Sequence, residues 1–147
     1  MAIMDYRLEF ADSTSVGAAV ATTVVGNIID LGAASTFNDS TRNADYGDGT
    51  PIYLHVRMNA AATGTTNVST IAFYLQEAGS TTAASFANAL TLKAATVVGT
   101  YVAGYKVYDA ALPSRSYKRY LRLAAAVATS SLTAGTVDGF ISLDPVT

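Results

Sequence analysis

The chain has 147 residues, half of them hydrophobic and 14% charged, and it contains no cysteine. Its formal net charge of −2 and its pI near 5.1 give no overall attraction to nucleic acid or anionic lipid, and the lack of cysteine excludes disulfides and thiolate chemistry. A chain of this length suits one domain, which we place at residues 1–147, with a core large enough to fold without cross-links.

The N-terminal part contains an apolar run at residues 16–29. This run is shorter than the roughly 20 residues of a membrane-spanning helix. Asp5, Glu9 and Asp12 precede it, where a signal peptide carries positive charge. We therefore expect neither a membrane anchor nor a signal peptide. Residues 1–12 and 144–147 are candidates for extended arms, because termini that are not tied into a sheet are free to reach a neighbour.

Alternation of apolar and polar residues is clearest at residues 51–60 and predicts a strand with one buried and one exposed face. The segment at 68–76 follows the same pattern, and a polar, glycine-containing connection separates the two, so we expect neighbouring antiparallel strands. At 51–60 the apolar residues are Ile52, Leu54, Val56 and Met58, and the polar side carries Tyr53, His55, Arg57 and Asn59.

Turn residues divide the rest of the chain into further short strands, and only residues 81–92 could contribute a short helix. About eight strands without alternating helices predict an all-β, two-sheet antiparallel sandwich or barrel, with at most one or two short helical turns. The predicted strands are 6–10, 22–31, 51–60, 68–76, 89–98, 105–112, 117–127 and 136–144.

The stretch at 115–127 interleaves cations with tyrosines. On a strand, Leu121 and Leu123 would face the core while the opposite face would carry Lys118, Tyr120 and Arg122. Such a face can hold single-stranded bases, but the acidic domain and the lack of a second aromatic strand favour a structural or protein-contact role. We expect Arg119 and Arg122 to contact protein carboxylates or solvent. The candidate partner-contact face comprises Lys118, Tyr120, Arg122, Tyr53, His55 and Arg57.

The only histidine, His55, has no cysteine or sequence-adjacent acid beside it, although Asp30, Asp39 or Asp109 could approach it in space. We expect a surface or interface histidine. The loop residues Asn43, Asp45 and Asp48 offer oxygen ligands for calcium, but their spacing does not match an EF-hand, and a turn explains them equally well. No phosphate-binding loop or persuasive carboxylate pair is present, so we predict no catalytic, cofactor-binding or metal-binding residues and no enzymatic activity.

Several phrases taken in order resemble one protein family: "DYRLEFADSTSV", "NIIDLG", "YGDGTPIYLHVRMNAA", "RYLRLAAAV" and "TAGTVDGFISLDP". The chain resembles, almost from end to end, the jelly-roll capsid cement (decoration) proteins of short-tailed bacteriophages, the group first seen on a Bordetella phage head. These motifs are turns and strands rather than catalytic signatures, so contact positions on the capsid do not transfer residue by residue.

The resemblance implies a jelly-roll virion structural protein that forms a homo-dimer or homo-trimer. It would bind the major capsid protein on the outer surface of the head, after assembly in the host cytoplasm, with no nucleic-acid or membrane partner. The alternative is a carbohydrate-binding or receptor-binding β-sandwich, since nine tyrosines could stack on sugars, although tryptophan is absent. A cupin-type enzyme is a third possibility, but cupins assemble a cluster of histidine and carboxylate ligands that one histidine cannot supply.

Overall fold

Eight strands and two short 3-10 helices form the part of the chain that the computed structural model describes, residues 8–32, 51–64 and 68–142. No helix in those ranges is long and apolar enough to cross a membrane. In chain order the elements are β1 (Glu9–Ser15), β2 (Thr22–Asp30), β3 (Tyr53–Gly64), β4 (Thr70–Ala78), η2 (Ala83–Ser85), β5 (Ala87–Val97), η3 (Val98–Thr100), β6 (Lys106–Ala111), β7 (Tyr120–Ala128) and β8 (Leu132–Ser142).

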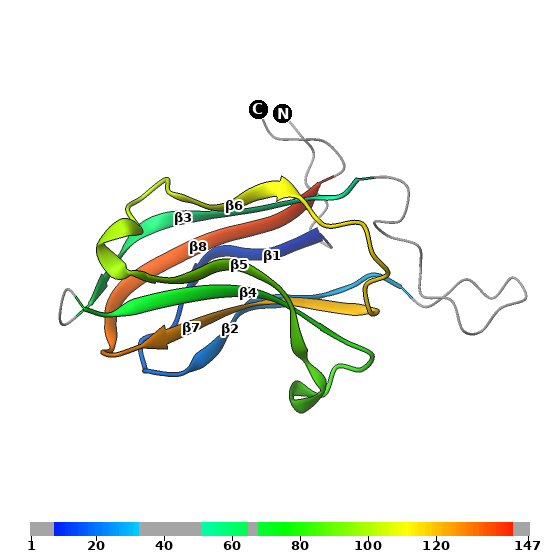
Figure 1. Cartoon of the computed structure of the whole chain (residues 1–147), viewed down its shortest axis with the longest axis horizontal. Helices are drawn as coiled ribbons and strands as arrows, with labels where there is room; N and C mark the ends of the chain where they lie inside the picture. Colours follow the sequence, from blue (N-terminus) through cyan, green and yellow to red (C-terminus); the bar gives the residue numbers. More distant parts are fainter. Residues whose placement is uncertain (1–7, 33–50, 65–67, 143–147) are drawn as a thin grey trace, which may run out of the picture.

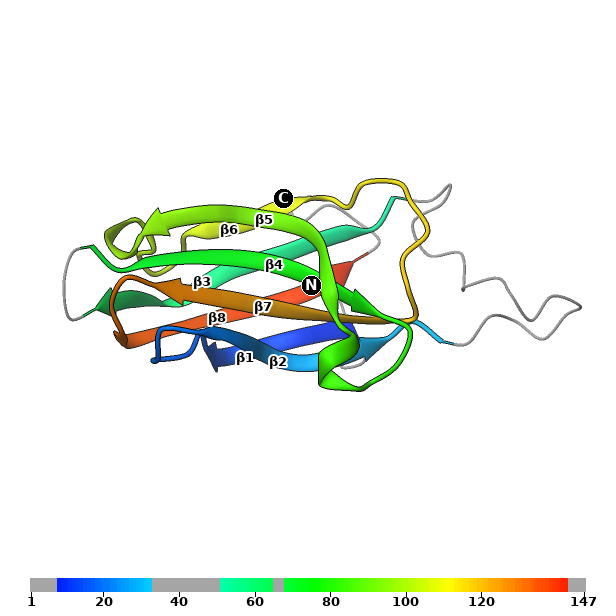
Figure 2. The ribbon, with the colours of Figure 1, turned by 60° about the horizontal axis from the view of Figure 1, so that its bottom comes forward.

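The strands form two four-stranded antiparallel sheets that face each other (Figures 1 and 2). One sheet has the order β1-β8-β3-β6 and the other the order β2-β7-β4-β5. Strands β1 to β4 alternate between the two sheets, and β5 to β8 then pair with them in reverse order, β5 with β4 and finally β8 with β1. This arrangement is a jelly roll. The structure therefore confirms the predicted all-β, two-sheet antiparallel jelly-roll sandwich with short helical turns only.

The core lies between the sheets and is built from the inward side of each strand. In β3, Leu54, Val56 and Met58 are each at most 1% exposed, as their alternation predicts. Phe73 of β4 and Leu123 of β7 face them from the second sheet and are equally buried. Each such side chain stabilises the fold by about 1.5–3 kcal/mol. The alternation of apolar and polar residues thus determines which side of each strand faces the core and which side faces outward, where a partner could bind.

The first strand differs from the prediction, because it runs over Glu9–Ser15 rather than residues 6–10. It pairs with β8, and Phe10 at its start is fully buried. Residues 9–12 are therefore part of the sheet and not of an extended arm, since burying Phe10 ties this segment to the core. Residues 1–7 and the proposed arm at 144–147 lie outside the described residues.

Residues 81–92, the one candidate helix, divide into the 3-10 helix η2 and the first part of β5. The helix is a single turn because the chain must enter β5 at Ala87, where it begins to pair with Glu77 of β4. Tertiary pairing here overrides local helix propensity.

Candidate functional site

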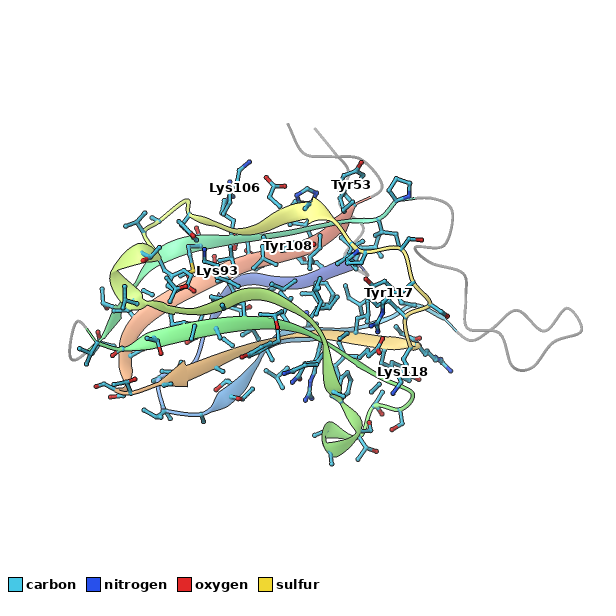
Figure 3. All side chains as sticks on the ribbon, in the orientation of Figure 1. Tyr53, Lys93, Lys106, Tyr108, Tyr117 and Lys118 are labelled. Carbon is cyan, nitrogen blue, oxygen red and sulfur yellow. The ribbon has the colours of Figure 1, made fainter. Side chains whose placement is uncertain are left out.

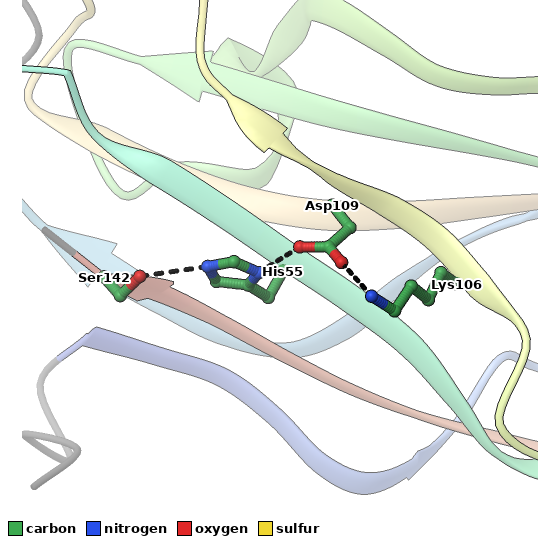
Figure 4. A network of polar contacts seen from close by, with 4 residues as sticks. All are labelled: His55, Lys106, Asp109 and Ser142. Atoms are coloured by element: carbon green, nitrogen blue, oxygen red, sulfur yellow. Dashed lines mark hydrogen bonds and ion pairs between the residues drawn. The ribbon is translucent and has the colours of Figure 1, made fainter. Parts of the chain in front are cut away.

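A network of polar side chains crosses the outer face of three adjacent strands of the β1-β8-β3-β6 sheet (Figure 4). His55 of β3 is at its centre, with Nδ1 2.6 Å from Asp109 Oδ1 of β6 and Nε2 3.0 Å from Ser142 Oγ of β8. The second carboxylate oxygen of Asp109 lies 2.5 Å from Lys106 Nζ. The polar network thus joins three strands through one imidazole.

The register of the strands explains why these residues meet. His55 lies directly opposite Asp109 on one side and Phe140 on the other. The pairing of β3 with β6 shifts between Val56 and Arg57, which adds one residue on β6. Residues three apart on a regular strand point to opposite faces, but this bulge turns Lys106 and Asp109 to the same face.

The centre of the network is well buried, although it lies on an outer sheet face. His55 is 7% exposed, with its ring 5.0 Å from that of Phe140 and 6.4 Å from that of Tyr53. His55 is therefore not a freely exposed surface histidine, because these neighbouring aromatic rings cover the imidazole, and its predicted role at an interface stays a prediction. Of the acids that could approach His55, Asp109 does so, Asp30 pairs elsewhere, and Asp39 lies outside the described residues.

Electrostatics favour the ionised carboxylate in this network. The hydrogen bond from Lys106 is the largest cause that lowers the pKa of Asp109, and the bond to His55 adds to it. A neutral imidazole that donates its Nδ1 proton to Asp109 accepts the Ser142 hydroxyl at Nε2. An imidazolium donates to both partners instead, because the hydroxyl can rotate. The network is satisfied in either protonation state of His55.

The order Ser142–His55–Asp109 is the connectivity of a serine hydrolase triad, which the sequence analysis did not assign. In a triad the carboxylate orients the histidine and stabilises its imidazolium form. Here Lys106 shares that carboxylate and weakens its pull on the imidazole. The relay geometry is nevertheless present, and it places the Ser142 hydroxyl, as a nucleophile, within hydrogen-bond reach of His55 as its general base.

A groove of about 270 Å³ lies at the network and is lined in part by its residues. Arg57 and Lys106 stand at this groove, and Arg57 Nη2 lies 3.7 Å from Asp138 Oδ2. The residues that line it are His55, Val56, Arg57, Lys106, Tyr108, Asp109 and Phe140. Arginine and aromatic residues, here Arg57, Tyr108 and Phe140, are types enriched at protein interfaces.

On the other sheet, Arg122 of β7 is held by its own chain. Its Nε donates to Gln76 Oε1 at 2.8 Å, its Nη2 donates to the Ala83 carbonyl at 3.4 Å, and its guanidinium lies 3.9 Å from the centre of the Phe86 ring. Arg122 is 9% exposed, and burial lowers its pKa. The expectation that it contacts carboxylates or solvent is wrong, because the connection between β4 and β5 folds over it.

Two other cations of the basic stretch, Arg115 and Arg119, also have intramolecular partners. Arg119 makes a two-pronged contact with Asp30, with Nε and Nη2 each 2.8 Å from a carboxylate oxygen, which confirms its predicted carboxylate partner. Arg115 Nη2 lies 2.5 Å from Glu77 Oε1, and the backbone N–H of Lys118 donates to the same carboxylate. Acids therefore neutralise much of the positive charge that suggested a nucleic-acid site.

The six residues of the candidate partner-contact face are divided between the two sheets. Tyr53, His55 and Arg57 belong to β3, whereas Tyr120 and Arg122 belong to β7 and Lys118 precedes it. Figure 3 shows Tyr53 and Lys118 at well-separated places on the molecule. Alternation predicts which side of a strand is polar, but it does not predict which sheet a strand joins.

The candidate calcium ligands Asn43, Asp45 and Asp48 lie outside the described residues. Within residues 8–32, 51–64 and 68–142, no group of three or more histidine or acidic side chains could hold a metal ion.

Comparison with known families connects the fold to a group of proteins. The Bbp16 family matches residues 10–141, which is nearly the whole chain and all but the ends of the jelly roll. The chain belongs to the Bbp16 family. The family name indicates a phage-associated protein, in agreement with the resemblance of the sequence. A comparison with curated proteins gives no match. The matched residues span both sheets, so they include the groove beside His55 and the strand that carries Arg122.

Proposed function

We propose that this Bbp16 protein is a non-enzymatic capsid cement, or decoration, protein of a phage virion. It binds the outer surface of the head and stabilises contacts between major capsid protein subunits. The observation that carries the proposal is the family match over residues 10–141, which spans the jelly roll and both of its outer faces.

The form of the molecule supports this role. A cement protein works through fitted surface area, and two sheets around one core give two broad outer faces on a rigid body. Several of their polar side chains, including His55, Arg119 and Arg122, are held by intramolecular bonds. Less side-chain freedom is then lost on binding. Self-association as a dimer or trimer would add avidity, by about 10²–10⁴-fold, through simultaneous contacts with several subunits.

Co-sedimentation with expanded, empty phage heads tests this role, together with light scattering of the protein alone. Saturable binding at a fixed ratio to capsid subunits is the expected result, and the oligomer mass then identifies the symmetry axis. A protein that stays in the supernatant as a monomer would contradict the proposal. A glycan array with and without calcium would then test the carbohydrate-binding alternative.

One observation favours a second candidate function, acyl transfer by Ser142. In that reaction Ser142 Oγ would attack an ester carbonyl, His55 Nε2 would take the hydroxyl proton and return it to the leaving alcohol, and water would release the acyl group. Labelling by a fluorophosphonate probe that disappears in both Ser142→Ala and His55→Ala would establish a reactive serine. Equal labelling of wild type and Ser142→Ala would exclude it.

A further inference from the structure

Arg57 and Lys106 form an unusual pair at the groove beside His55. They are direct cross-strand partners in the register of β3 and β6, and both line the groove. Like charges directly opposite each other on one sheet face destabilise a strand pair. The fold therefore holds two cations together at a position where an anion between them would be stabilising.

Asp109 already supplies Lys106 with an anion 2.5 Å from its Nζ, but both cations remain mostly exposed and Arg57 has only a distant acid. The side chains of Arg57 and Lys106 are 61% and 65% exposed, whereas their partners Asp138 and Asp109 are each 24% exposed. The contact of Arg57 with Asp138 is 3.7 Å, longer than a hydrogen bond. The formal charges of Arg57, Lys106, Asp109 and Asp138 sum to zero, but the two cations are the more exposed groups. An approaching partner therefore meets positive charge first.

The groove also has features that select the kind of anion. Phe140 and the buried His55 give it an aromatic lining that suits the methylene groups of an acidic side chain. Asp109 and Asp138 would repel a continuous phosphate backbone, and the net charge of −2 gives no long-range attraction to one. A single carboxylate between the two cations meets the same two acids with one negative charge instead of a row of them, so its repulsion is smaller.

We propose that this groove binds an acidic segment of a protein partner, with one Asp or Glu carboxylate bridging Arg57 and Lys106. This inference rests on the proposed function, in which the partner is the major capsid protein. A bridging carboxylate would give Lys106 a second anionic contact beside Asp109 and would give Arg57 a direct charge-assisted hydrogen bond, for which its planar guanidinium is suited to a two-pronged grip.

Binding isotherms on expanded heads, at low and moderate salt, test the inference with four proteins. These are the wild type, Arg57→Ala/Lys106→Ala, the charge-retaining Arg57→Lys/Lys106→Arg, and Lys118→Ala as an exposed cation beside the other sheet. The double alanine variant should bind about tenfold more weakly or worse and lose much of its salt dependence. The charge-retaining variant should stay closer to wild type, and Lys118→Ala should equal wild type. Thermal unfolding of each protein controls for folding.

The outcomes separate the inference from the proposed function. If wild type binds heads and the double alanine variant binds equally well, the groove inference is wrong and the cement role stands. If wild type does not bind heads, the cement role fails, and NMR titration with a glutamate-rich peptide against its glutamine counterpart decides the inference. Shifts at Arg57 and Lys106 with the glutamate peptide alone would support a carboxylate site, and shifts with neither peptide would overturn it.

Discussion

At the scale of single residues, the polar side chains of the outer faces act as fixed contacts between strands. His55 joins β6, β3 and β8, while Arg119, just before β7, reaches Asp30 at the end of β2. Each contact gives hydrogen-bond partners to polar side-chain groups that would otherwise depend on solvent for them. Their energetic effect therefore depends on protonation and on the fit of individual atoms.

Asp109 gives the fold an acid-sensitive contribution. Its folded pKa lies below its unfolded value because Lys106, and then His55, hydrogen bond to the ionised form. The stability it adds is complete above the unfolded pKa of about 3.9 and is lost as pH falls through the lower folded pKa. Asp109→Asn should thus melt below wild type at neutral pH, and the difference should shrink in acid.

Thermal unfolding between pH 7 and pH 3 measures this difference, with Asp12→Asn, at an exposed position of β1, as the matched control. The control should follow wild type throughout. A gap between Asp109→Asn and wild type that stays constant down to the lowest pH would contradict the linkage.

Gly26 in the middle of β2 is required by close backbone approach. Its φ is +76°, and a Cβ there would lie 1.9 Å from the Phe10 carbonyl oxygen of β1. Gly104 has a similar φ of +82° but open space around it. Gly104→Ala should cost about 1–2 kcal/mol of unfolding free energy from backbone strain alone. Gly26→Ala should cost at least about 3 kcal/mol because β1 must also move.

Urea unfolding measures the free energy of unfolding that each alanine variant loses. Both glycines have a similar positive φ, so the cost of placing alanine in that conformation cancels in the difference between the two losses. Equal losses in the two variants would show that β1 is not as close to β2 as the structure has it.

At the scale of elements, Arg122 contacts and stabilises the connection between β4 and β5. It contacts Ala83 in η2 and Phe86 just before β5, and that connection is otherwise mostly exposed. Arg122→Lys keeps the charge but loses the planar fork and the ring stacking. We expect faster proteolysis and hydrogen exchange across residues 79–88 in this variant, with the sheets intact.

Arg119→Lys is the matched control, because Arg119 lies on the same stretch but binds Asp30 instead of this connection. Limited proteolysis with mass spectrometry locates the cuts. Unchanged cutting at 79–88 in Arg122→Lys would show that the connection is held by other contacts.

The strands themselves could be predicted from sequence, because burial of one face imposes alternation on residues such as Leu54 and Met58. The start of β1 and the short η2 could not, since pairing with β8 and β4 decides them. The groove could not be predicted either. It depends on the bulge that brings Lys106 to the side of Asp109, and no local residue pattern marks that register shift.

At the scale of the whole molecule, the two sheets are linked across the core near η3. Tyr101 is fully buried and donates its hydroxyl to the Ile71 carbonyl of β4, while its own carbonyl accepts from Ala62 of β3. Its ring packs edge-on against Phe73 and Tyr105. Ionising this phenol would put an unpaired negative charge between the sheets.

This buried phenol should contribute to the alkaline limit of the entire fold. Burial raises the pKa of Tyr101 from 10.0 to about 12. The resulting stability is complete below the unfolded pKa of about 10 and is lost as pH rises through the folded pKa. Tyr101→Phe should cost about 1 kcal/mol at neutral pH through the lost hydrogen bond. It should also depend less on pH above 10, so its stability should approach that of wild type.

Urea midpoints at pH 7 and pH 11, followed by circular dichroism, test this, with Tyr53→Phe as a half-exposed control. Burial also raises the pKa values of Tyr108 and Tyr117, so wild type should lose stability in alkali even without Tyr101. The decisive quantity is therefore the difference between variants. If the deficit of Tyr101→Phe at pH 7 persists unchanged at pH 11, its phenol does not set the alkaline limit.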